Sequence, residues 1–296
     1  MCLKKKRNEV ITAMYENFTL TGFSDEISEK ITEQFEHLNK LGIEYFEPRG
    51  IDGKNISELT CDDVKALKEN MQKYGIKVSS IGSPIGKIGI KDDFDAHLEL
   101  LKKMIGIAKE LGTKYIRVFS FFIPKDENPE DYREEVIARM KAMTKLAEEN
   151  GIILLHENEK EIYGDIAPRC LDILKSVDSP NLRAVFDPAN FVQCGQKVYP
   201  DALHMLKDYV VYVHIKDALE NGDVVPAGFG IGNVKEVLSE LKQDGYKGFL
   251  SLEPHLGAFK GLENLELDDK MTKLDGSTPE KFTLAHNSLI NILKTL

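Results

Sequence analysis

The chain has 296 residues, of which 42% are hydrophobic, and this length allows one large domain or two small ones. Its formal net charge of −10 argues against nucleic acid as a partner, because binding to phosphates requires a basic surface. No stretch approaches the roughly 18 consecutive apolar residues of a membrane span, so we expect no membrane partner either.

Residues 1–16 are predicted to be an N-terminal extension. The opening MCLKKKRNEV is basic, and the polar residues that follow it do not form the apolar region of a secretory signal. Four cysteines, Cys2, Cys61, Cys170 and Cys194, are scattered along the chain without the close spacing of zinc or redox motifs. We therefore expect a cytoplasmic protein with reduced thiols.

Short β-rich runs alternate with longer amphipathic segments from residue 18 to the end of the chain, which predicts a parallel sheet. We expect strands over 18–23, 43–48, 77–83, 114–122, 152–157, 182–187, 210–216 and 248–254. We expect helices over 28–42, 60–75, 94–112, 129–151, 167–177, 199–208, 233–245 and 281–296. Several of these helical segments end in glycine, which favours the left-handed conformation that terminates a helix.

Eight expected strands, each followed by a helix, predict a (β/α)8 TIM barrel, which belongs to the α/β class. A doubly wound sheet is the main alternative. It usually has fewer strands, and no glycine-rich phosphate loop follows the first strand here. Because no linker rich in proline, serine or glycine interrupts the pattern, we expect a single TIM-barrel domain over residues 1–296.

Four consecutive strands end in residues that bind metals, namely Glu157, Asp187, His214 and Glu253. In a TIM barrel the catalytic groups project from the C-terminal ends of the strands, so these side chains would meet at one mouth. Taken singly, each carboxylate is explained as a helix cap or a salt-bridge partner, and the histidine as a hydrogen-bonded structural residue. Together they indicate a shared divalent metal site, because a buried charge is costly unless it is paired or binds a metal.

The same strand ends, LLHENE, AVFDPAN, VHIKD and LSLEPH, resemble the xylose-isomerase-like TIM-barrel superfamily of sugar phosphate isomerases and epimerases. That superfamily includes tagatose 3-epimerase-like enzymes, hydroxypyruvate isomerases, inosose dehydratases and endonuclease IV. The resemblance extends over nearly the whole chain, beginning at GFSDEIS (22–28). It implies that Glu157, Asp187, His214 and Glu253 are metal ligands, and that the two glutamates also exchange the substrate proton.

Hard oxygen donors with one imidazole suit Mn²⁺, Mg²⁺ or Co²⁺ better than a structural zinc site, with Zn²⁺ as a further option. A metal chelated by a carbonyl and the neighbouring hydroxyl stabilises the enediolate that forms when the α-carbon loses its proton. A carboxylate on each side can remove that proton and return it. Return to the same carbon gives epimerisation, return to the adjacent carbon gives aldose–ketose isomerisation, and the residue set does not choose between them.

Other residues near the strand ends are expected to contact the substrate. Ser83 and Lys87 lie on the loop IGSPIGKIG (81–89) after the third strand, where Lys87 either holds an anionic group or is a solvated loop lysine. Glu47 and Arg49 follow the second strand, with a salt bridge within the barrel as the competing interpretation. Asn190 occupies a position where the relatives implied by the resemblance often have a substrate-contacting histidine.

A second set of residues lies beside the expected ligands in the sequence. Such ligands usually need hydrogen-bonded supports, and these neighbours are expected to supply them or to contact the substrate. The set consists of His156, Lys216, Asp217 and His255.

Two segments depart from the pattern of the family. The loop VPAGFGIGN (225–233) resembles one that carries an acidic residue between two glycines in many relatives, whereas Phe229 fills that place here. Any substrate contact implied by that loop is therefore in doubt. The segment 256–280 is long for a connection and poorly periodic, which predicts either a lid or a solvated insertion.

These observations predict a divalent-metal-dependent isomerase or epimerase of a small sugar or polyol, with or without a phosphate group. The alternatives are a keto-polyol dehydratase that uses the same metal site and a non-catalytic sugar-binding relative. The endonuclease branch is disfavoured by the net charge of −10 and by the seven histidines, most of which lie away from strand ends. The resemblance implies a carbohydrate substrate and a homodimer or homotetramer.

Overall fold

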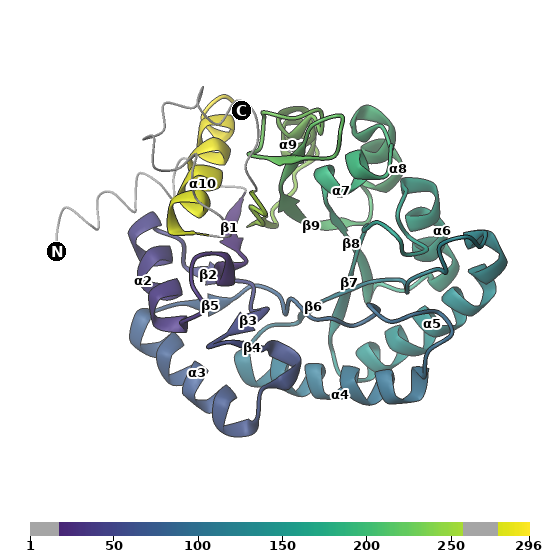
Figure 1. The fold of residues 1–296 in the computed structure, drawn as a ribbon, viewed down its shortest axis with the longest axis horizontal. Coiled ribbons are helices and arrows are strands. Elements are labelled where there is room, and N and C mark those ends of the chain that lie inside the picture. Colours follow the sequence, from purple (N-terminus) through teal and green to yellow (C-terminus); the bar gives the residue numbers. More distant parts are fainter. Residues whose placement is uncertain (1–17, 257–277) are drawn as a thin grey trace.

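The computed structural model describes residues 18–256 and 278–296, which form a TIM barrel. Six parallel strands pair in the order β1 (Thr19–Gly22), β12 (Phe249–Leu252), β9 (Val210–Ile215), β8 (Leu182–Phe186), β7 (Ile153–Glu157) and β6 (Tyr115–Val118). Two further strands, β2 (Tyr45–Phe46) and β5 (Lys77–Val78), pair with each other. The two sheets curl around a common centre in Figure 1.

Backbone hydrogen bonds close the barrel where the strands are too short to form a continuous ladder. The N–H of Glu47, just after β2, donates to the carbonyl of Gly22 at 2.9 Å. On the other side, the N–H of Ile81 donates to the carbonyl of Tyr115, and the N–H of Arg117 donates to the carbonyl of Ile81. All eight predicted strands are therefore confirmed, although β2, β5 and β6 are shorter than expected.

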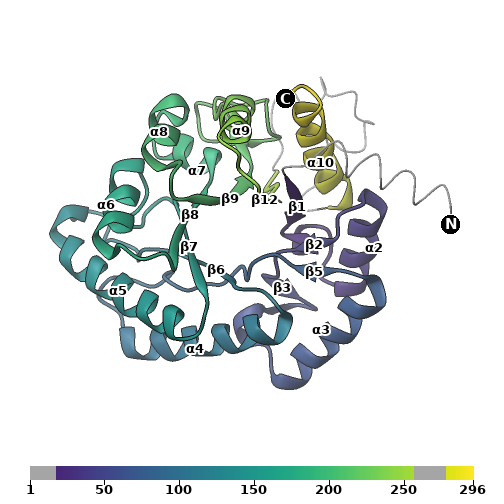
Figure 2. The ribbon, with the colours of Figure 1, turned by 180° about the vertical axis from the view of Figure 1, so that it is seen from behind.

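Helices surround the strands as an outer ring in both Figure 1 and Figure 2. They are α2 (Ile31–Leu41), α3 (Cys61–Tyr74), α4 (Phe94–Leu111), α5 (Arg133–Glu149), α6 (Ala167–Val177), α8 (Leu203–Leu206), α9 (Val234–Gln243) and α10 (Pro279–Leu293). The ring closes where α10 packs against α2. Glycine C-caps end α2, α3 and α4 at Gly42, Gly75 and Gly112, each with a positive φ near 70–78° that favours glycine.

Two predicted helices differ from the observed ones. The segment predicted as a helix over 129–151 begins with a 3₁₀ turn at Pro129–Tyr132, and α5 follows it. The segment predicted over 199–208 contains a wide turn at Val198–Ala202 before α8. In both places a proline lies in the first turn and removes a backbone donor, which the hydrophobic periodicity does not reveal.

Several short elements at the mouth were not predicted. They are the helix α7 (Pro188–Gln193) and the hairpins β3 (Gly50–Ile51) with β4 (Lys54–Asn55), and β10 (Asp217–Ala218) with β11 (Val224–Val225). Short 3₁₀ turns also occur at Ser24–Glu26 and Ile56–Glu58. Elements of two to six residues are too short to show a period, so only the structure places them.

Two sequence predictions fall on parts of the chain that the structure does not describe. The N-terminal extension (1–16) lies outside the described residues, and so does the predicted lid (256–280) except for Leu256 and residues 278–280. At the end of that segment α10 begins at Pro279, two residues before its predicted start. Within the described ranges, no helix is long and apolar enough to cross a membrane.

Candidate metal centre

Glu157, Asp187, His214 and Glu253 project into the barrel from adjacent strands. Side chains two residues apart on a strand share a face, so each of these residues lies directly above a more deeply placed inward residue. Those deeper residues are Leu155, Val185, Tyr212 and Ser251, all 2% exposed or less. The alternation explains why apolar strands end in charged groups: the deeper layer fills the barrel, and the next inward position opens at the mouth.

The four predicted ligands lie together and are buried. His214 Nδ1 is 3.1 Å from Glu157 Oε1, 3.4 Å from Glu253 Oε2 and 3.8 Å from Asp187 Oδ2. One possible ligand atom from each residue lies within 4.8 Å of the others. None of the four residues is more than 3% exposed. The tertiary structure therefore brings together four side chains that are up to 96 positions apart in the sequence.

Asp187 has two separate contacts. Its Oδ1 accepts a hydrogen bond from the N–H of Asn190 at 2.9 Å, so it caps α7. Its Oδ2 turns towards His214 and makes no hydrogen bond, although it lies 3.0 Å from Lys216 Nζ. The helix-cap interpretation and the ligand interpretation therefore apply to different oxygens of one carboxylate.

Asn190 reinforces the same region. Its Nδ2 donates to Glu157 Oε1 at 3.2 Å and to the carbonyl of Asn158 at 2.9 Å. Asn158 in turn exchanges two hydrogen bonds with the backbone of Asp187, each 3.0 Å long. Because these contacts are buried, Asn190 and Asn158 fix Glu157 and Asp187 relative to each other.

Electrostatic effects on the cluster oppose one another. Burial disfavours the charged form of Glu157, but His214 and Arg117 outweigh it and lower the pKa of this carboxylate to about 2. Burial raises the pKa of Asp187 to about 7, even though Lys216 acts in the other direction. Burial would lower the pKa of His214, but Glu157 and Glu47 raise it well above its usual value. The carboxylates therefore attract positive charge strongly at the position of His214 Nδ1.

The donor set fits a hard divalent cation. Glu157 Oε2 and Asp187 Oδ2 are buried oxygens without a hydrogen bond; Glu157 Oε2 has an ion-pair contact with Arg117, and Asp187 Oδ2 has such contacts with Lys216 and His214. The three carboxylates converge on one point and offer several oxygens to a cation, with Lys216, Arg117 and Arg49 as their neighbouring positive groups. Carboxylate oxygens with one imidazole are the donors that Mn²⁺, Mg²⁺ and Co²⁺ accept, and Zn²⁺ also binds them.

Lys216 lies within the candidate metal centre and contacts two of the four predicted ligands. Its side chain is 4% exposed, and Nζ lies 3.0 Å from Asp187 Oδ2 and 3.1 Å from Glu253 Oε2. The sequence placed it among the supports of the ligands, and the structure confirms that contact.

A second group of potential ligands, Glu26, Glu253 and His255, lies beside the first and shares Glu253 with it. Arg49 reaches all three of these side chains. Its Nη1 is 3.2 Å from Glu253 Oε1 and 3.3 Å from His255 Nε2, and its Nη2 is 3.4 Å from Glu26 Oε1. Arg49 also pairs with Asp25 at 2.8 Å. The salt-bridge interpretation of Arg49 is confirmed, and its positive charge disfavours a second cation beside the first.

Arg117 and Phe23 are mouth residues that the sequence interpretation missed. Arg117 is 5% exposed, and its Nη1 lies 3.3 Å from Glu157 Oε2. The Phe23 ring lies 4.6 Å from the Arg49 guanidinium and 5.0 Å from that of Arg117, and it contacts the edge of His214. A charged residue inside the apolar run KYIRVFSFF was the available indication for Arg117, because an arginine there needs a buried partner. Nothing local marked Phe23.

The remaining predicted residues are dispersed. Ser83 is buried, and its hydroxyl donates to the carbonyl of Arg117. Lys87 is partly exposed, pairs with Glu159 at 3.3 Å and lies over the ring of Phe119. His156 is buried with its Nε2 unpartnered, and burial lowers its pKa to about 4. As an outward residue of β7 it points away from the inward-facing cluster.

Asp217 supports a loop. Its carboxylate accepts hydrogen bonds from the N–H groups of Gly228, Gly230 and Gly232 at 2.8–3.1 Å. A Cβ at Gly230 would lie 2.3 Å from Asp217 Oδ1, so glycine is required at this close approach. The segment that departs from the family pattern is therefore held rigidly, and Phe229 is 48% exposed on it.

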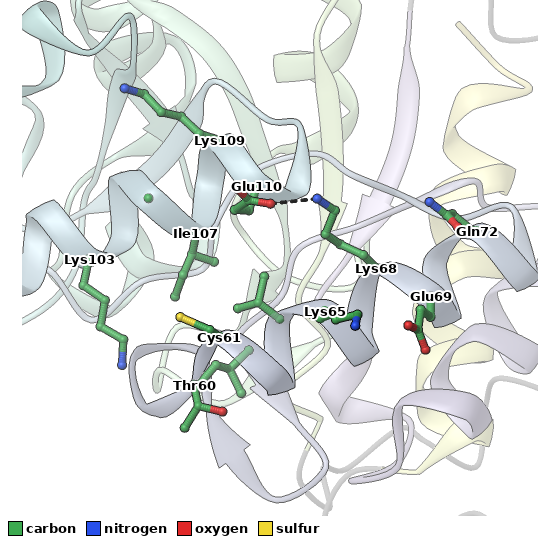
Figure 3. A pocket seen from close by; sticks show the side chains of 13 residues that line it. Thr60, Cys61, Lys65, Lys68, Glu69, Gln72, Lys103, Ile107, Lys109 and Glu110 are labelled. Carbon is green, nitrogen blue, oxygen red and sulfur yellow. Dashed lines mark hydrogen bonds and ion pairs between the residues drawn. The ribbon is translucent and has the colours of Figure 1, made fainter.

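A groove on the outside of the barrel contains none of the predicted site residues. It lies between α3 and α4 and has a volume of about 860 Å³. Figure 3 shows its lining, including Cys61 and Ile107, and the 2.7 Å contact between Lys68 and Glu110. The groove offers apolar surface and lysines but no convergent set of buried acids, so the candidate chemistry stays at the mouth.

The family model described as "xylose isomerase-like TIM barrel" matches residues 35–268. Among curated proteins, 3-dehydroshikimate dehydratase of Bacillus anthracis is 23% identical over 242 residues, which are 74% of this chain and 83% of that protein.

Two solved structures are also similar. One is the IOLI protein with a bound zinc atom, with a TM-score of 0.74, 20% identity and coverage of 94% of this chain and 98% of that one. The other is a D-tagatose 3-epimerase-like protein, with a TM-score of 0.71, 18% identity and coverage of 94% and 97%. At these identities the solved structures support the fold alone.

Proposed function

The chain belongs to the xylose isomerase-like TIM barrel family, and from this premise we propose that it is a divalent-metal-dependent enzyme that isomerises or epimerises a small sugar or polyol. The observation that carries the proposal is the buried group of Glu157, Asp187, His214 and Glu253, with its ligand atoms within 4.8 Å of one another. Proteins with the same fold include one described with a bound zinc atom and one described as D-tagatose 3-epimerase-like, and the proposal is consistent with those descriptions.

We propose that these four residues hold Mn²⁺, Mg²⁺ or Co²⁺, with Zn²⁺ as the alternative. When bound, the ion would polarise the substrate carbonyl and stabilise negative charge on its oxygen. The chain would contribute orientation, because Asn190 and Asn158 fix the carboxylates, and exclusion of water, because the ligands are buried.

Glu157 and Glu253 would move the proton. Glu157 Oε1 and Glu253 Oε2 face His214 Nδ1, while Glu157 Oε2 lies beside Arg117 and Glu253 Oε1 lies beside Arg49. One of the two carboxylates would remove the proton next to the carbonyl, and the other would return one. Return on the opposite face of the same carbon gives an epimer, and return to the adjacent carbon gives an isomer.

Among the other predicted residues, we propose His255 and Lys87 as substrate contacts. The His255 side chain is 44% exposed and lies 3.6 Å from Glu253, and the Lys87 side chain is 37% exposed on the loop after β5, where it pairs with Glu159. We propose that Arg49, Asn190, Ser83, Asp217 and His156 act through the residues they contact.

Dehydration is the second candidate, because a curated relative is a 3-dehydroshikimate dehydratase. The first step would be the same removal of a proton by a glutamate. The electron pair left on carbon would then expel a β-hydroxyl group, which leaves as water after protonation. Product mass separates the two reactions, since isomerisation conserves mass and dehydration loses water.

The test is metal analysis of protein purified without chelator, comparing wild type with His214→Ala and Glu157→Gln. His204→Ala is the matched control, because His204 is 54% exposed on α8 and its Nε2 lies 3.1 Å from Glu240, away from the mouth. We expect near-stoichiometric metal in wild type and His204→Ala, and loss of metal in the other two variants. Ketoses and keto-polyols should then exchange a carbon-bound proton with solvent deuterium in the presence of wild type.

A folded wild type that binds no divalent metal even after loading would overturn the proposal. Sugar binding without proton exchange by the metal-loaded protein would instead support a non-catalytic sugar-binding role.

A further inference from the structure

A chain of buried polar groups lies beneath the candidate metal centre, inside the barrel. Glu47, which follows β2, is 1% exposed, and its Oε2 accepts hydrogen bonds from the Tyr212 hydroxyl at 2.8 Å and from the Ser251 hydroxyl at 2.7 Å. The Tyr212 oxygen also lies 2.9 Å from Ser79 Oγ, which is 2.7 Å from Thr21 Oγ1. Three strands and the segments after β2 and β5 therefore contribute to one closed network around a carboxylate.

His214 links this network to the centre above it. While Nδ1 faces the carboxylates of the mouth, Nε2 points down and lies 3.5 Å from Glu47 Oε2. Nε2 has no hydrogen-bond partner, and neither has the second oxygen of Glu47, Oε1. Buried polar groups are costly to leave unpaired, which favours a hydrogen bond between the two side chains.

The ring of His214 is held in this orientation by its neighbours. Phe23 packs against it edge-on with ring centroids 5.3 Å apart, and Tyr212 does the same at 5.8 Å. These two T-shaped contacts fix the plane of the imidazole between buried aromatic rings.

We propose that Glu47 is a positioning residue for His214: it accepts the Nε2 proton, so that Nδ1 offers its lone pair to the metal ion. This inference rests on the proposed metal-dependent function and deepens it. A neutral imidazole carries one proton, and the nitrogen that keeps it is decided by the hydrogen bond made on the other side. Tyr212 and Ser251 hold the carboxylate in place, so Glu47 is itself oriented before any metal binds.

The first test measures the dissociation constant for Mn²⁺ by electron paramagnetic resonance of free manganese. Glu47→Gln keeps the size of the side chain and removes its charge, and we expect Mn²⁺ to bind about 10- to 100-fold more weakly. Tyr212→Phe, which removes one donor to Glu47, should weaken binding less. Thr21→Val is the matched control, because Thr21 is 0% exposed at the far end of the same network, and it should leave the Mn²⁺ affinity unchanged.

The second test observes the imidazole directly, by nuclear magnetic resonance of ¹⁵N-labelled protein with and without Zn²⁺. The His214 signals are assigned by their loss in His214→Gln. We expect a slowly exchanging Nε2–H resonance in wild type that persists when Zn²⁺ binds, and that moves or exchanges rapidly in Glu47→Gln. A purely structural role for Glu47 would lower stability without changing this resonance.

The outcomes separate the two proposals. Wild type that binds no metal overturns the proposed function, and the role of Glu47 is then decided by the Nε2–H resonance alone. Wild type that binds metal while Glu47→Gln binds it equally well overturns the role of Glu47 and leaves the proposed function intact. Should Glu47→Gln fail to fold, a Zn²⁺-loaded wild type that lacks an Nε2–H proton overturns the inference.

Discussion

The two glutamates of the mouth have different surroundings. Glu157 lies beside Arg117, whose side chain is 6% exposed, and Asn190 donates to it at 3.2 Å. Glu253 lies beside Arg49, which is 23% exposed, and beside His255, which is 44% exposed. One glutamate is therefore sealed inside the protein, whereas the other faces a network that reaches solvent.

This difference implies that losing a charged partner destabilises the protein more on the Glu157 side, which we call the sealed side, than on the Glu253 side, which we call the open side. Charges in the sealed region interact through a medium of low polarity, so removing a partner there leaves an uncompensated buried charge. Near solvent, water screens the same kind of pair and reduces its effect. The Phe23 ring lies against both arginines and connects the two sides, with centroid distances of 4.6 Å to Arg49 and 5.0 Å to Arg117.

The largest effect is expected when each glutamate loses its ability to accept a proton. Glu157→Gln and Glu253→Gln should each reduce exchange of a carbon-bound substrate proton by about 100- to 10,000-fold, the usual contribution of a general acid or base. Glu149→Gln on the exposed end of α5 is the control and should retain activity. Rates measured with saturating metal separate lost proton transfer from lost metal. Full activity in both mouth variants would contradict the assignment.

The two arginines should differ in what their removal does to stability. Arg117→Met should lower the free energy of unfolding of the metal-free protein by about 3–5 kcal/mol, because it removes one of the two positive groups that stabilise the buried Glu157 carboxylate, leaving only His214. Arg49→Met should lower it by about 1–3 kcal/mol, since Arg49 itself and its partners Asp25 and His255 keep contact with water, which screens these charges. Urea denaturation of both variants and wild type makes the comparison. An effect of Arg49→Met larger than that of Arg117→Met would refute the distinction between a sealed and an open side.

The free energy of unfolding is expected to depend on pH through Glu26, which lies beside Arg49 on the Glu253 side. Burial raises the pKa of Glu26 from 4.5 to about 8, although Arg49 acts against it. The folded protein then binds this proton more tightly than the unfolded chain, so stability is highest below pH 4.5 and falls as the pH rises towards 8.

Glu26→Gln should remove that part of the pH dependence. Denaturation at pH 5, 6.5 and 8 is expected to show a steeper loss of stability in wild type than in the variant. Glu69→Gln, at an exposed position on α3, serves as the control and should behave like wild type. Parallel curves for wild type and Glu26→Gln would show that Glu26 titrates normally in the folded protein.

The smallest effect on stability is expected for a substitution in an outer helix, far from both glutamates. Thr60 caps α3, and its side chain accepts a hydrogen bond from the N–H of Asp63 while Asp63 reciprocates. Thr60→Ala should lower the free energy of unfolding by about 1 kcal/mol and leave the Mn²⁺ affinity unchanged. Denaturation and metal titration of the same preparation test both statements. A weakened metal site in this variant would mean that the outer helices are coupled to the mouth.

Much of the barrel was predictable because its elements repeat. Each strand contributes an apolar run and each helix an amphipathic segment with a glycine or a capping residue at its end, and these patterns are local. The clustering of Glu157, Asp187, His214 and Glu253 was also predictable, because equivalent positions of parallel strands converge at one mouth. Short insertions such as α7 and the hairpin β3–β4 were missed, since they have too few residues to show a period.

The supporting residues were only partly predictable. Lys216 was placed correctly beside the ligands because it follows His214 by two positions, directly after the end of β9. Arg117 was missed, although its charge within an apolar run was visible, because no local pattern says which carboxylate it meets. Glu47 was named for a substrate contact or a salt bridge, whereas the structure places it against two hydroxyl groups inside the barrel.

The sequence by itself determined the α/β repeat, the inward alternation along each strand and the residue types at four strand ends, because these depend on neighbours within a few positions. Only the tertiary structure decided which oxygen of each carboxylate faces His214, which arginine accompanies each glutamate, and that Asp217 holds a loop. Those relations join residues from different strands and loops, and they follow from the curvature of the closed barrel and the packing of side chains inside it.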